Sequence, residues 1–144
     1  WQKTIDINLT APYQLSQLVI KKMKENGWGR IMNIASLQSI RAFDNSIPYG
    51  ASKGGVMQLT RALAQAYSKS GILVNAIAPG FFHTKLTESL FQDPEKLKVL
   101  AGKTMMNRNG EKDDLFGISV FLCSDANSYI TGQTVFLDGG FSAQ

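Results

Sequence analysis

An alternation of short apolar runs with long segments of helical periodicity constrains the fold more than any other feature of the sequence. The runs "RIMNIAS" (Arg30–Ser36), which follows a glycine turn, and "GILVNAIAPG" (Gly71–Gly80), which ends at Pro79-Gly80, are mostly apolar, as buried strands are. Apolar residues recur at helical spacing over Gln2–Glu25, and Pro48 opens a second long helix that reaches about Ser70. Parallel strands need such helical crossovers, so the alternation predicts an α/β domain with a parallel sheet.

Past the second strand the sequence indicates shorter elements. Only one further strand is readable, and a doubly wound dinucleotide-binding sheet has about six. No G-x-G-x-x-G turn follows a strand. We therefore expect one domain over residues 1–144 that is the C-terminal part of a doubly wound fold, with its first, glycine-rich βαβ half missing, in a truncated product or fragment with an exposed sheet edge. The elements predicted here are helices at Thr84–Leu90, Pro94–Leu100 and Glu111–Leu122, and a turn and strand within Thr131–Gly140.

Composition excludes several functional classes. The 144 residues include one cysteine, Cys123, and one histidine, His83, so neither an internal disulfide nor a Cys/His zinc site is expected, and no metal is predicted. No run of about 18 apolar residues and no leader pattern can be read, so we expect neither a membrane span nor a signal peptide, and the single cysteine fits a reducing cytoplasm. The net charge of +4 is scattered over the chain rather than gathered in a stripe, so we expect no nucleic-acid partner.

A serine, a tyrosine and a lysine surround the loop between the first strand and the second long helix. Tyr49 and Lys53 are four residues apart, so they lie on one helix face, where an ammonium favours ionisation of a phenol. Ser36 lies at the end of the strand, where open α/β sheets bind ligands, and its hydroxyl can hold a carbonyl oxygen. A Tyr-x-x-x-Lys pair alone is common on helix surfaces. Together with the serine it is suited to move a proton to or from an alcohol oxygen while a cofactor takes the hydride.

The motifs around these residues resemble those of the short-chain dehydrogenase/reductase family. The family's serine, its tyrosine thirteen residues later and its lysine four further on match Ser36, Tyr49 and Lys53. Its helix asparagine matches Asn8 in "DINLT", and Thr84 follows the strand end "NAIAPG" as in the family. The closing "TGQTVFLDGG" also matches, so the resemblance extends over essentially the whole chain. It implies a Rossmann-type fold, although the family's N-terminal phosphate-binding turn has no counterpart here.

The resemblance implies a role for each matching residue. Tyr49 would be the catalytic acid and base, and Lys53 would promote its ionisation and hold the nicotinamide ribose. Ser36 would orient the substrate carbonyl, and Asn8 would bend its helix and anchor a water in a proton relay. The cofactor would be NAD or NADP, because the residues that select between them have no counterpart. The residues implied for the cofactor are Tyr49, Lys53, Pro79, Gly80, Phe82 and Thr84, and those implied for the substrate are Ser36, Gln38, Tyr49 and Phe81.

The substrate is expected to be selected by two loops over the cleft, Leu37–Pro48 and Phe81–Asn107. The segments around the motifs are most similar to the gluconate 5-dehydrogenase branch, which implies a sugar acid such as gluconate and its 5-keto form. The 2-deoxy-gluconate 3-dehydrogenases and 3-oxoacyl-carrier-protein reductases are the alternatives. Arg41 offers a fork for a carboxylate but is equally well explained as a solvated loop residue, and His83 is interpreted as a loop residue.

A second class of function is left open, in which the chain is catalytically inactive and acts only as an assembly module. The two long helices match the pair that members of the family pack across a two-fold axis. Small residues on the second helix, Ala51, Gly54, Gly55 and Ala62, would allow a close approach. The resemblance therefore also implies a homodimer or homotetramer. Asp138–Gly140 is interpreted as a structural turn near a subunit contact.

Overall fold

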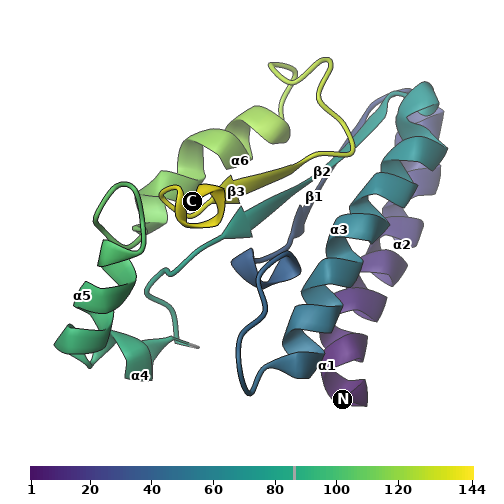
Figure 1. The fold of residues 1–144 in the computed structure, drawn as a ribbon. Coiled ribbons are helices and arrows are strands. Elements are labelled where there is room, and N and C mark those ends of the chain that lie inside the picture. The colour runs from purple at the N-terminus through teal and green to yellow at the C-terminus, as the bar shows by residue number, and fades with distance from the viewer. Residues whose placement is uncertain (86) are drawn as a thin grey trace.

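Three strands form a single sheet in which every pairing is parallel. In the computed structural model, which describes residues 1–85 and 87–144, the strands are β1 (Gly29–Ile34), β2 (Ile72–Pro79) and β3 (Thr134–Leu137). They lie in the order β1-β2-β3, with Gly29 opposite Ile72 and Ala76 opposite Thr134. The predicted α/β fold with a parallel sheet is therefore confirmed, and the central strand is the most deeply buried (Figure 1).

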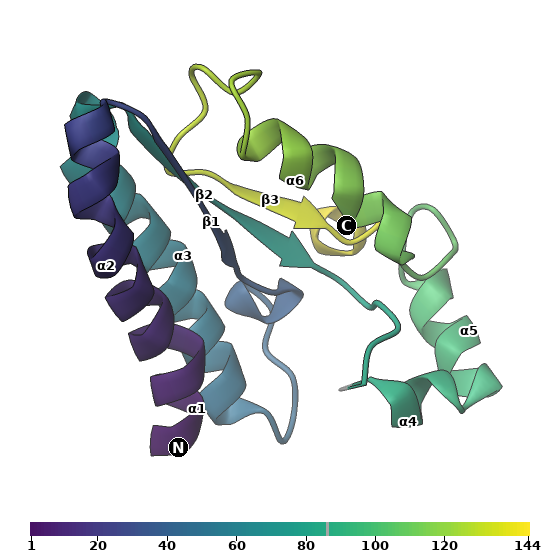
Figure 2. The ribbon, with the colours of Figure 1, turned by 180° about the vertical axis from the view of Figure 1, so that it is seen from behind.

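The two long helices cover one face of this sheet, as Figures 1 and 2 show from opposite sides. The first runs as α1 (Gln2–Ile5), a π-helical turn (Asp6–Thr10) and α2 (Ala11–Asn26), and the second is α3 (Ile47–Tyr67). Because alternate residues of a strand share a face, β2 presents one row of side chains to these helices. That packing makes two core clusters: Ile20, Leu63, Ala64, Ile72 and Val74, and Ala35, Val56, Ala76 and Ala78.

Shorter helices lie on the other side of the sheet. A helical turn at Lys112–Leu115 leads into α6 (Phe116–Leu122), while α4 (Glu88–Phe91) and α5 (Pro94–Gly102) stand beyond the end of β2 (Figure 1). In the part of the chain that the structure describes, no helix has the length and apolar character needed to cross a membrane.

Two predicted helix starts were wrong, since the helix expected over Glu111–Leu122 is an α-helix only from Phe116. The helix expected over Thr84–Leu90 begins only at Glu88, because Thr84 and Thr87 form a closed turn in front of it. The Thr87 hydroxyl accepts the Thr84 N–H at 2.9 Å and donates to the Phe82 carbonyl at 2.6 Å. Hydroxyls that bind nearby backbone in this way compete with helix formation. Leu86, within the predicted helix, lies outside the described residues.

The π-helical turn brings the first helix close to the start of α3. A π-turn adds a residue to the helical repeat and is frequent at functional sites. Asn8 lies in this turn, so its helix departs from α-helical geometry there, and the bend that the resemblance implies stays a prediction. Gly55 of α3 faces the same turn, and a methyl group on it would lie 2.8 Å from a Leu9 methyl carbon. Gly55 therefore allows α3 to lie close to the π-helical turn of the same chain.

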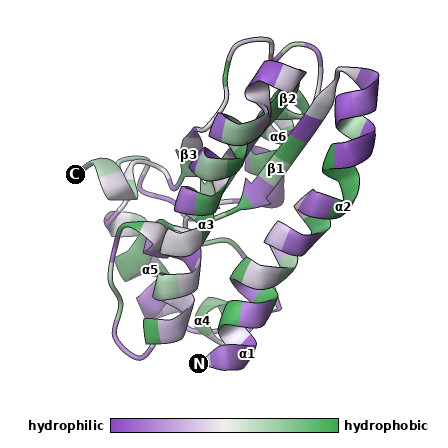
Figure 3. Cartoon of the chain, turned by 90° about the vertical axis from the view of Figure 1, so that its right-hand side faces the viewer, coloured by the Kyte–Doolittle hydropathy of each residue, from purple (hydrophilic) through white to green (hydrophobic). Residues whose placement is uncertain are grey.

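The sheet has two outer edges, along β1 and along β3. Figure 3, coloured by hydropathy, shows strands that are largely hydrophobic between helices that mix both characters. β1 carries no second strand partner among the described residues, and Ile34 at its end is 50% exposed. The edge expected to be exposed is therefore β1, the strand that leads to Ser36.

Candidate active site

Ser36 follows the end of β1 and begins a short helical turn, Leu37–Ser39. Its N–H donates to the Ser39 hydroxyl at 3.2 Å, and its own hydroxyl oxygen accepts the Gln38 N–H at 3.2 Å. The residue is thus held by one hydrogen bond from its backbone and one to its side chain, and it is only 8% exposed. Because the Ser36 oxygen acts as an acceptor here, its own proton remains available for donation to a ligand.

Tyr49 and Lys53 lie one turn apart at the start of α3. The Lys53 ammonium is 5.6 Å from the centre of the Tyr49 ring and donates to the Ile34 carbonyl at 2.7 Å. Lys53 is 9% exposed, and burial lowers its pKa from the ordinary value of 10.5 because the charged form loses water. The end of β1 therefore fixes the ammonium beside the tyrosine.

Two serine hydroxyls tie the segments of this site together. Ser39 donates to the Lys53 carbonyl at 2.7 Å while accepting from Ser36, so it joins the loop to α3. Ser52 is fully buried; it donates to the Tyr49 carbonyl at 2.7 Å and accepts from the Asn8 amide at 3.1 Å. The segments that carry the four predicted catalytic residues are thus connected through hydroxyls that sequence reasoning did not single out.

A cavity of about 520 Å³ opens beside Ser36 and Tyr49. Of the residues predicted for the substrate, Gln38 and Phe81 also line it. Phe43 and Phe81 stack edge to face at 6.1 Å, and Phe141 packs against both, so part of the wall is aromatic. The other lining residues are Thr4, Leu37, Asn45, Ser46, Pro48, Gly80 and Thr87.

The residues predicted for the cofactor do not all lie together. Pro79 ends β2, and Gly80 lines the cavity while pressed against Asp138, where a methyl group would meet the Asp138 Cβ at 2.8 Å. The Phe82 side chain is buried on the other side of this segment, against Gly110. Thr84 is exposed in the turn described above.

Two charged or titratable loop residues are engaged away from the cavity. Arg41 donates to the Gln144 carbonyl at 2.8 Å and does not line the cavity, so no carboxylate fork faces Tyr49 from that position. His83 stacks on Phe91 with ring centres 4.9 Å apart, which agrees with its interpretation as a loop residue. The described lining residues carry no charged side chain.

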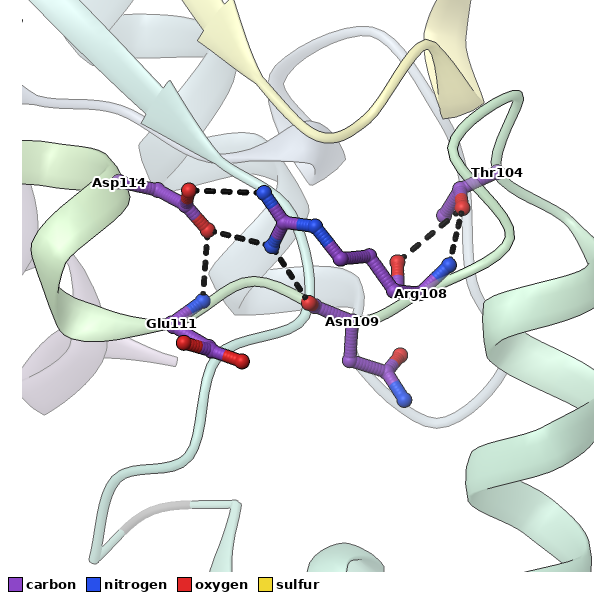
Figure 4. A network of polar contacts seen from close by, with 5 residues as sticks. All are labelled: Thr104, Arg108, Asn109, Glu111 and Asp114. Atoms are coloured by element: carbon purple, nitrogen blue, oxygen red, sulfur yellow. Dashed lines mark hydrogen bonds and ion pairs between the residues drawn. The ribbon is translucent and has the colours of Figure 1, made fainter.

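Figure 4 shows the polar network in the connection between α5 and the helical turn that leads into α6. Arg108 binds Asp114 through two bonds, of 2.7 and 2.8 Å, and Asp114 also accepts the Glu111 N–H. The bond to Arg108 lowers the pKa of Asp114 to about 2. Thr104 binds the Arg108 backbone at 3.1 and 3.2 Å. Thr104, Arg108 and Asp114 line a second cavity of about 260 Å³, which also includes Phe82 and shares Phe81 with the cavity beside Tyr49.

The donors at Lys53 and Tyr49 fit the hydroxyls of a ribose. Lys53 has three N–H donors and spends one on Ile34, and the Tyr49 hydroxyl can donate or accept. Neighbouring sugar hydroxyls need this combination of donors and acceptors. The described residues include no glycine-rich turn after a strand that would bind phosphates.

Some residues of the site were not predicted from the sequence, because little in the sequence around them marks them as part of a site. Thr4 and Thr87 reach the cavity only because α1 and the turn before α4 fold over it. Ser46 had a readable signal, since it stands directly before the Ile47-Pro48 helix start, where serine usually caps the helix. Ser39 and Ser52 had none, because serine is common in loops and on helices.

Comparison with known proteins points to one family. A family model described as enoyl-(acyl carrier protein) reductase matches residues 1–142. The chain is 39% identical over 140 residues to the 5-keto-D-gluconate 5-reductase of Escherichia coli K12, covering 97% of the chain and 55% of that protein. It is 37% identical to the gluconate 5-dehydrogenase of Gluconobacter oxydans, covering 99% and 56%. The chain thus spans slightly more than half the length of these curated relatives.

A solved structure agrees with these matches. The gluconate 5-dehydrogenase of Burkholderia cenocepacia, crystallised with NADP and tartrate, superposes with a TM-score of 0.92 at 37% identity. The match covers 95% of the present chain and 54% of that protein. The similarity therefore extends through the whole arrangement of strands and helices described above.

Proposed function

The chain belongs to the short-chain dehydrogenase/reductase family and forms the C-terminal part of its Rossmann-type fold, and on this basis we propose that the protein is an oxidoreductase. It transfers hydride between a nicotinamide cofactor, NAD or NADP, and an alcohol or ketone. One observation carries the proposal: Ser36 and Tyr49 line the same cavity, and Lys53 is anchored beside the tyrosine ring. Relatives with this fold are crystallised with NADP.

Each residue of the site has a distinct task in this proposal. The bound cofactor supplies or accepts the hydride. The Ser36 hydroxyl donates to the carbonyl oxygen of the substrate, and the Tyr49 hydroxyl delivers a proton to that oxygen or removes one from it. Lys53 stabilises the negative charge on the phenol oxygen during this exchange and, with Tyr49, would hold the ribose.

Asn8 belongs to the same arrangement through Ser52. Its amide donates to the Ser52 hydroxyl, which binds the carbonyl of Tyr49, and Asn8 lines a groove together with Lys53. We propose that Asn8 anchors water that exchanges protons with this groove. Pro79, Gly80, Phe82 and Thr84 stay proposals for the cofactor, of which Gly80 has the strongest support because it lines the cavity.

The proposed substrate is a sugar acid such as gluconate and its 5-keto form. Support comes from the names of the two curated relatives and from the amide and hydroxyl groups that line the cavity. A 3-oxoacyl-carrier-protein reductase activity is the second candidate. It is favoured by the aromatic part of the cavity wall, Phe43 and Phe81, against which Phe141 packs, and by the description of the family model.

Turnover tests both the chemistry and the substrate. The purified protein would be given NADPH or NADH with 5-ketogluconate or with a 3-oxoacyl thioester, and oxidation of the cofactor would be followed. We expect reduction of 5-ketogluconate, and a loss of about 100-fold or more in Tyr49→Phe, which lacks the proton-transferring hydroxyl. Tyr67→Phe, a change on the same helix away from the cavity, is the control. Reduction of the thioester alone would replace the substrate proposal, and no turnover with either would favour an assembly module.

We also propose that two copies associate through the long helices. The helix α2 exposes Leu15 and Leu18, which are 63% and 77% accessible, and Leu15 also lines the groove beside Lys53. Isolated exposed leucines are ordinary, but these lie beside Tyr13 and Val19, which are also exposed. Sedimentation should show a dimer or tetramer that Leu18→Glu dissociates. A wild-type monomer at high concentration would contradict the proposal.

A further inference from the structure

Ser46 occupies the N-cap position of α3 without capping the helix. A serine at this position usually accepts a backbone N–H of the first turn, which is worth about 1 kcal/mol. At α5 the N-cap Asp93 does so, accepting the Lys96 N–H at 3.1 Å. The Ser46 side chain makes no capping bond and instead donates to the Gln38 side-chain oxygen at 2.6 Å. Local rules of this kind are broken most often at functional sites.

The bond to Ser46 fixes which end of the Gln38 amide is free. Its oxygen is taken by the Ser46 hydroxyl, whose proton is shared with the Phe43 carbonyl 3.0 Å away. Its nitrogen makes no hydrogen bond within residues 1–85 and 87–144, so two N–H donors stay available. The Gln38 side chain lies over the first turn of α3, since a methyl group at Gly50 would be 3.8 Å from its oxygen.

The free amide lies in the same cavity as the reacting groups. Gln38 and Ser46 line it together with Ser36 and Tyr49, and the Gln38 backbone N–H binds the Ser36 hydroxyl. The described lining residues are uncharged, so this wall recognises neutral polar groups. A site built to donate to a substrate oxygen discriminates strongly against an analogue that lacks it, because the donors are then left unpaired.

We propose that Gln38 selects ketones that carry a hydroxyl beside the reacting carbonyl, and that Ser46 is the positioning residue that aims its amide. The proposal rests on the proposed reductase function. It deepens that function by naming the substrate class, which is ketones with a neutral hydroxyl on the carbon beside the carbonyl. The 5-keto form of a sugar acid carries a hydroxyl on each side of its ketone, whereas a 3-oxoacyl chain has no hydroxyl beside its ketone.

A matched pair of small ketones tests this selection without a sugar acid. The purified protein would reduce 2-hydroxycyclohexanone and cyclohexanone with NADPH, and the ratio of the two kcat/KM values would be compared among variants. We expect the wild type to prefer the hydroxyketone about tenfold or more. Ser46→Ala and Gln38→Leu should each bring the ratio close to one, mainly through KM of the hydroxyketone. Ser46→Thr, which keeps the hydroxyl, should retain the preference.

The double variant separates positioning from a general loss of structure. If Ser46 acts through Gln38, adding Ser46→Ala to Gln38→Leu should change the ratio no further. A fall in both kcat/KM values by the same factor would instead mean that Ser46 serves the fold, and would overturn the inference. An unchanged ratio in Ser46→Ala, or a ratio of one in the wild type, would also overturn it while leaving the reductase function intact.

A binding readout keeps the inference testable where turnover is absent. The side-chain amide of Gln38 gives its own pair of NMR signals, which can be assigned by their loss in Gln38→Leu. Addition of 2-hydroxycyclohexanone should shift them, and cyclohexanone should not. The same shift with both ketones, or with neither, would contradict the selection.

Discussion

Two hollows flank the turn of α3 that carries Tyr49 and Lys53, and they are built differently. The cavity beside Tyr49 is lined by uncharged side chains and is closed by loops of this chain, with an aromatic wall. The groove beside Lys53, of about 420 Å³, holds Asn8 and Arg30 and runs along β1, the edge strand. The two share no lining residue. Substrate selection at Gln38 and the charge supplied by Lys53 should therefore respond to separate mutations.

Lys53→Met should give the largest loss of turnover. It changes a residue that lines only the groove, so the choice between ketones should not change. The substitution removes the ammonium beside Tyr49, so we expect turnover to fall about 100-fold or more for every ketone, with the hydroxyketone preference unchanged. Steady-state kinetics with both ketones would measure this. Lys69→Met, at an exposed lysine after α3, is the matched control. A changed preference would break the separation between the two hollows.

Ser52→Ala should weaken the fold more than Ser46→Ala. The first change leaves the Asn8 amide without its partner and removes a fully buried bond to Tyr49, which should cost about 1 to 3 kcal/mol. The second removes a hydroxyl that caps nothing. Urea unfolding of both variants would show the difference. Equal losses would mean that the Ser46 hydroxyl stabilises α3 in a way its contacts do not reveal.

The burial of Lys53 should appear in the pH dependence of stability. Its pKa is lowered in the folded protein, so the unfolded chain binds more protons at this lysine in the interval just below 10.5. The free energy of unfolding should therefore rise with pH across that interval. Comparison of the wild type with Lys53→Met should isolate this slope, and an identical pH profile for the two would show that the ammonium is well solvated.

Arg108→Ala should have the smallest effect and should touch neither hollow. Without the guanidinium the pKa of Asp114 should return from about 2 toward 3.8, as an NMR titration of its carboxyl would show. The stabilisation by this pair is present above pH 3.8 and is lost as the pH falls through about 2. A change in ketone preference in this variant would mean that the second cavity near Phe82 communicates with Tyr49.

Sequence patterns predicted the fold well where burial decides the structure. The apolar runs at Arg30–Ser36 and Gly71–Gly80 became β1 and β2 with ends shifted by one or two residues, since a buried parallel strand leaves a continuous apolar signal. The start of α4 was missed because two threonine side chains compete for its backbone. Such local competition is not visible in hydrophobic periodicity.

In the candidate site, too, some residues were predictable from sequence patterns and others were not. Ser36, Tyr49 and Lys53 were found because their spacing and residue types carry chemistry, and the structure brings them together. Ser39, Ser46 and Ser52 were missed because a hydroxyl's partner depends on which loops meet in space. Phe82 and Thr84 were expected beside the cofactor from resemblance alone. Their side chains are buried against Gly110 and exposed in a turn, and their role stays a prediction.

The midpoint of thermal unfolding, measured with and without NADP, tests most directly whether Lys53 and Gln38 have separate roles. A ligand that binds the folded protein raises the midpoint according to its concentration and dissociation constant. We predict a rise for the wild type, for Gln38→Leu and for Lys69→Met, and none for Lys53→Met, because Lys53 is proposed to hold the nicotinamide ribose whereas Gln38 is proposed to contact only the substrate. An equal rise in Lys53→Met, or a rise that Gln38→Leu abolishes, would contradict the account.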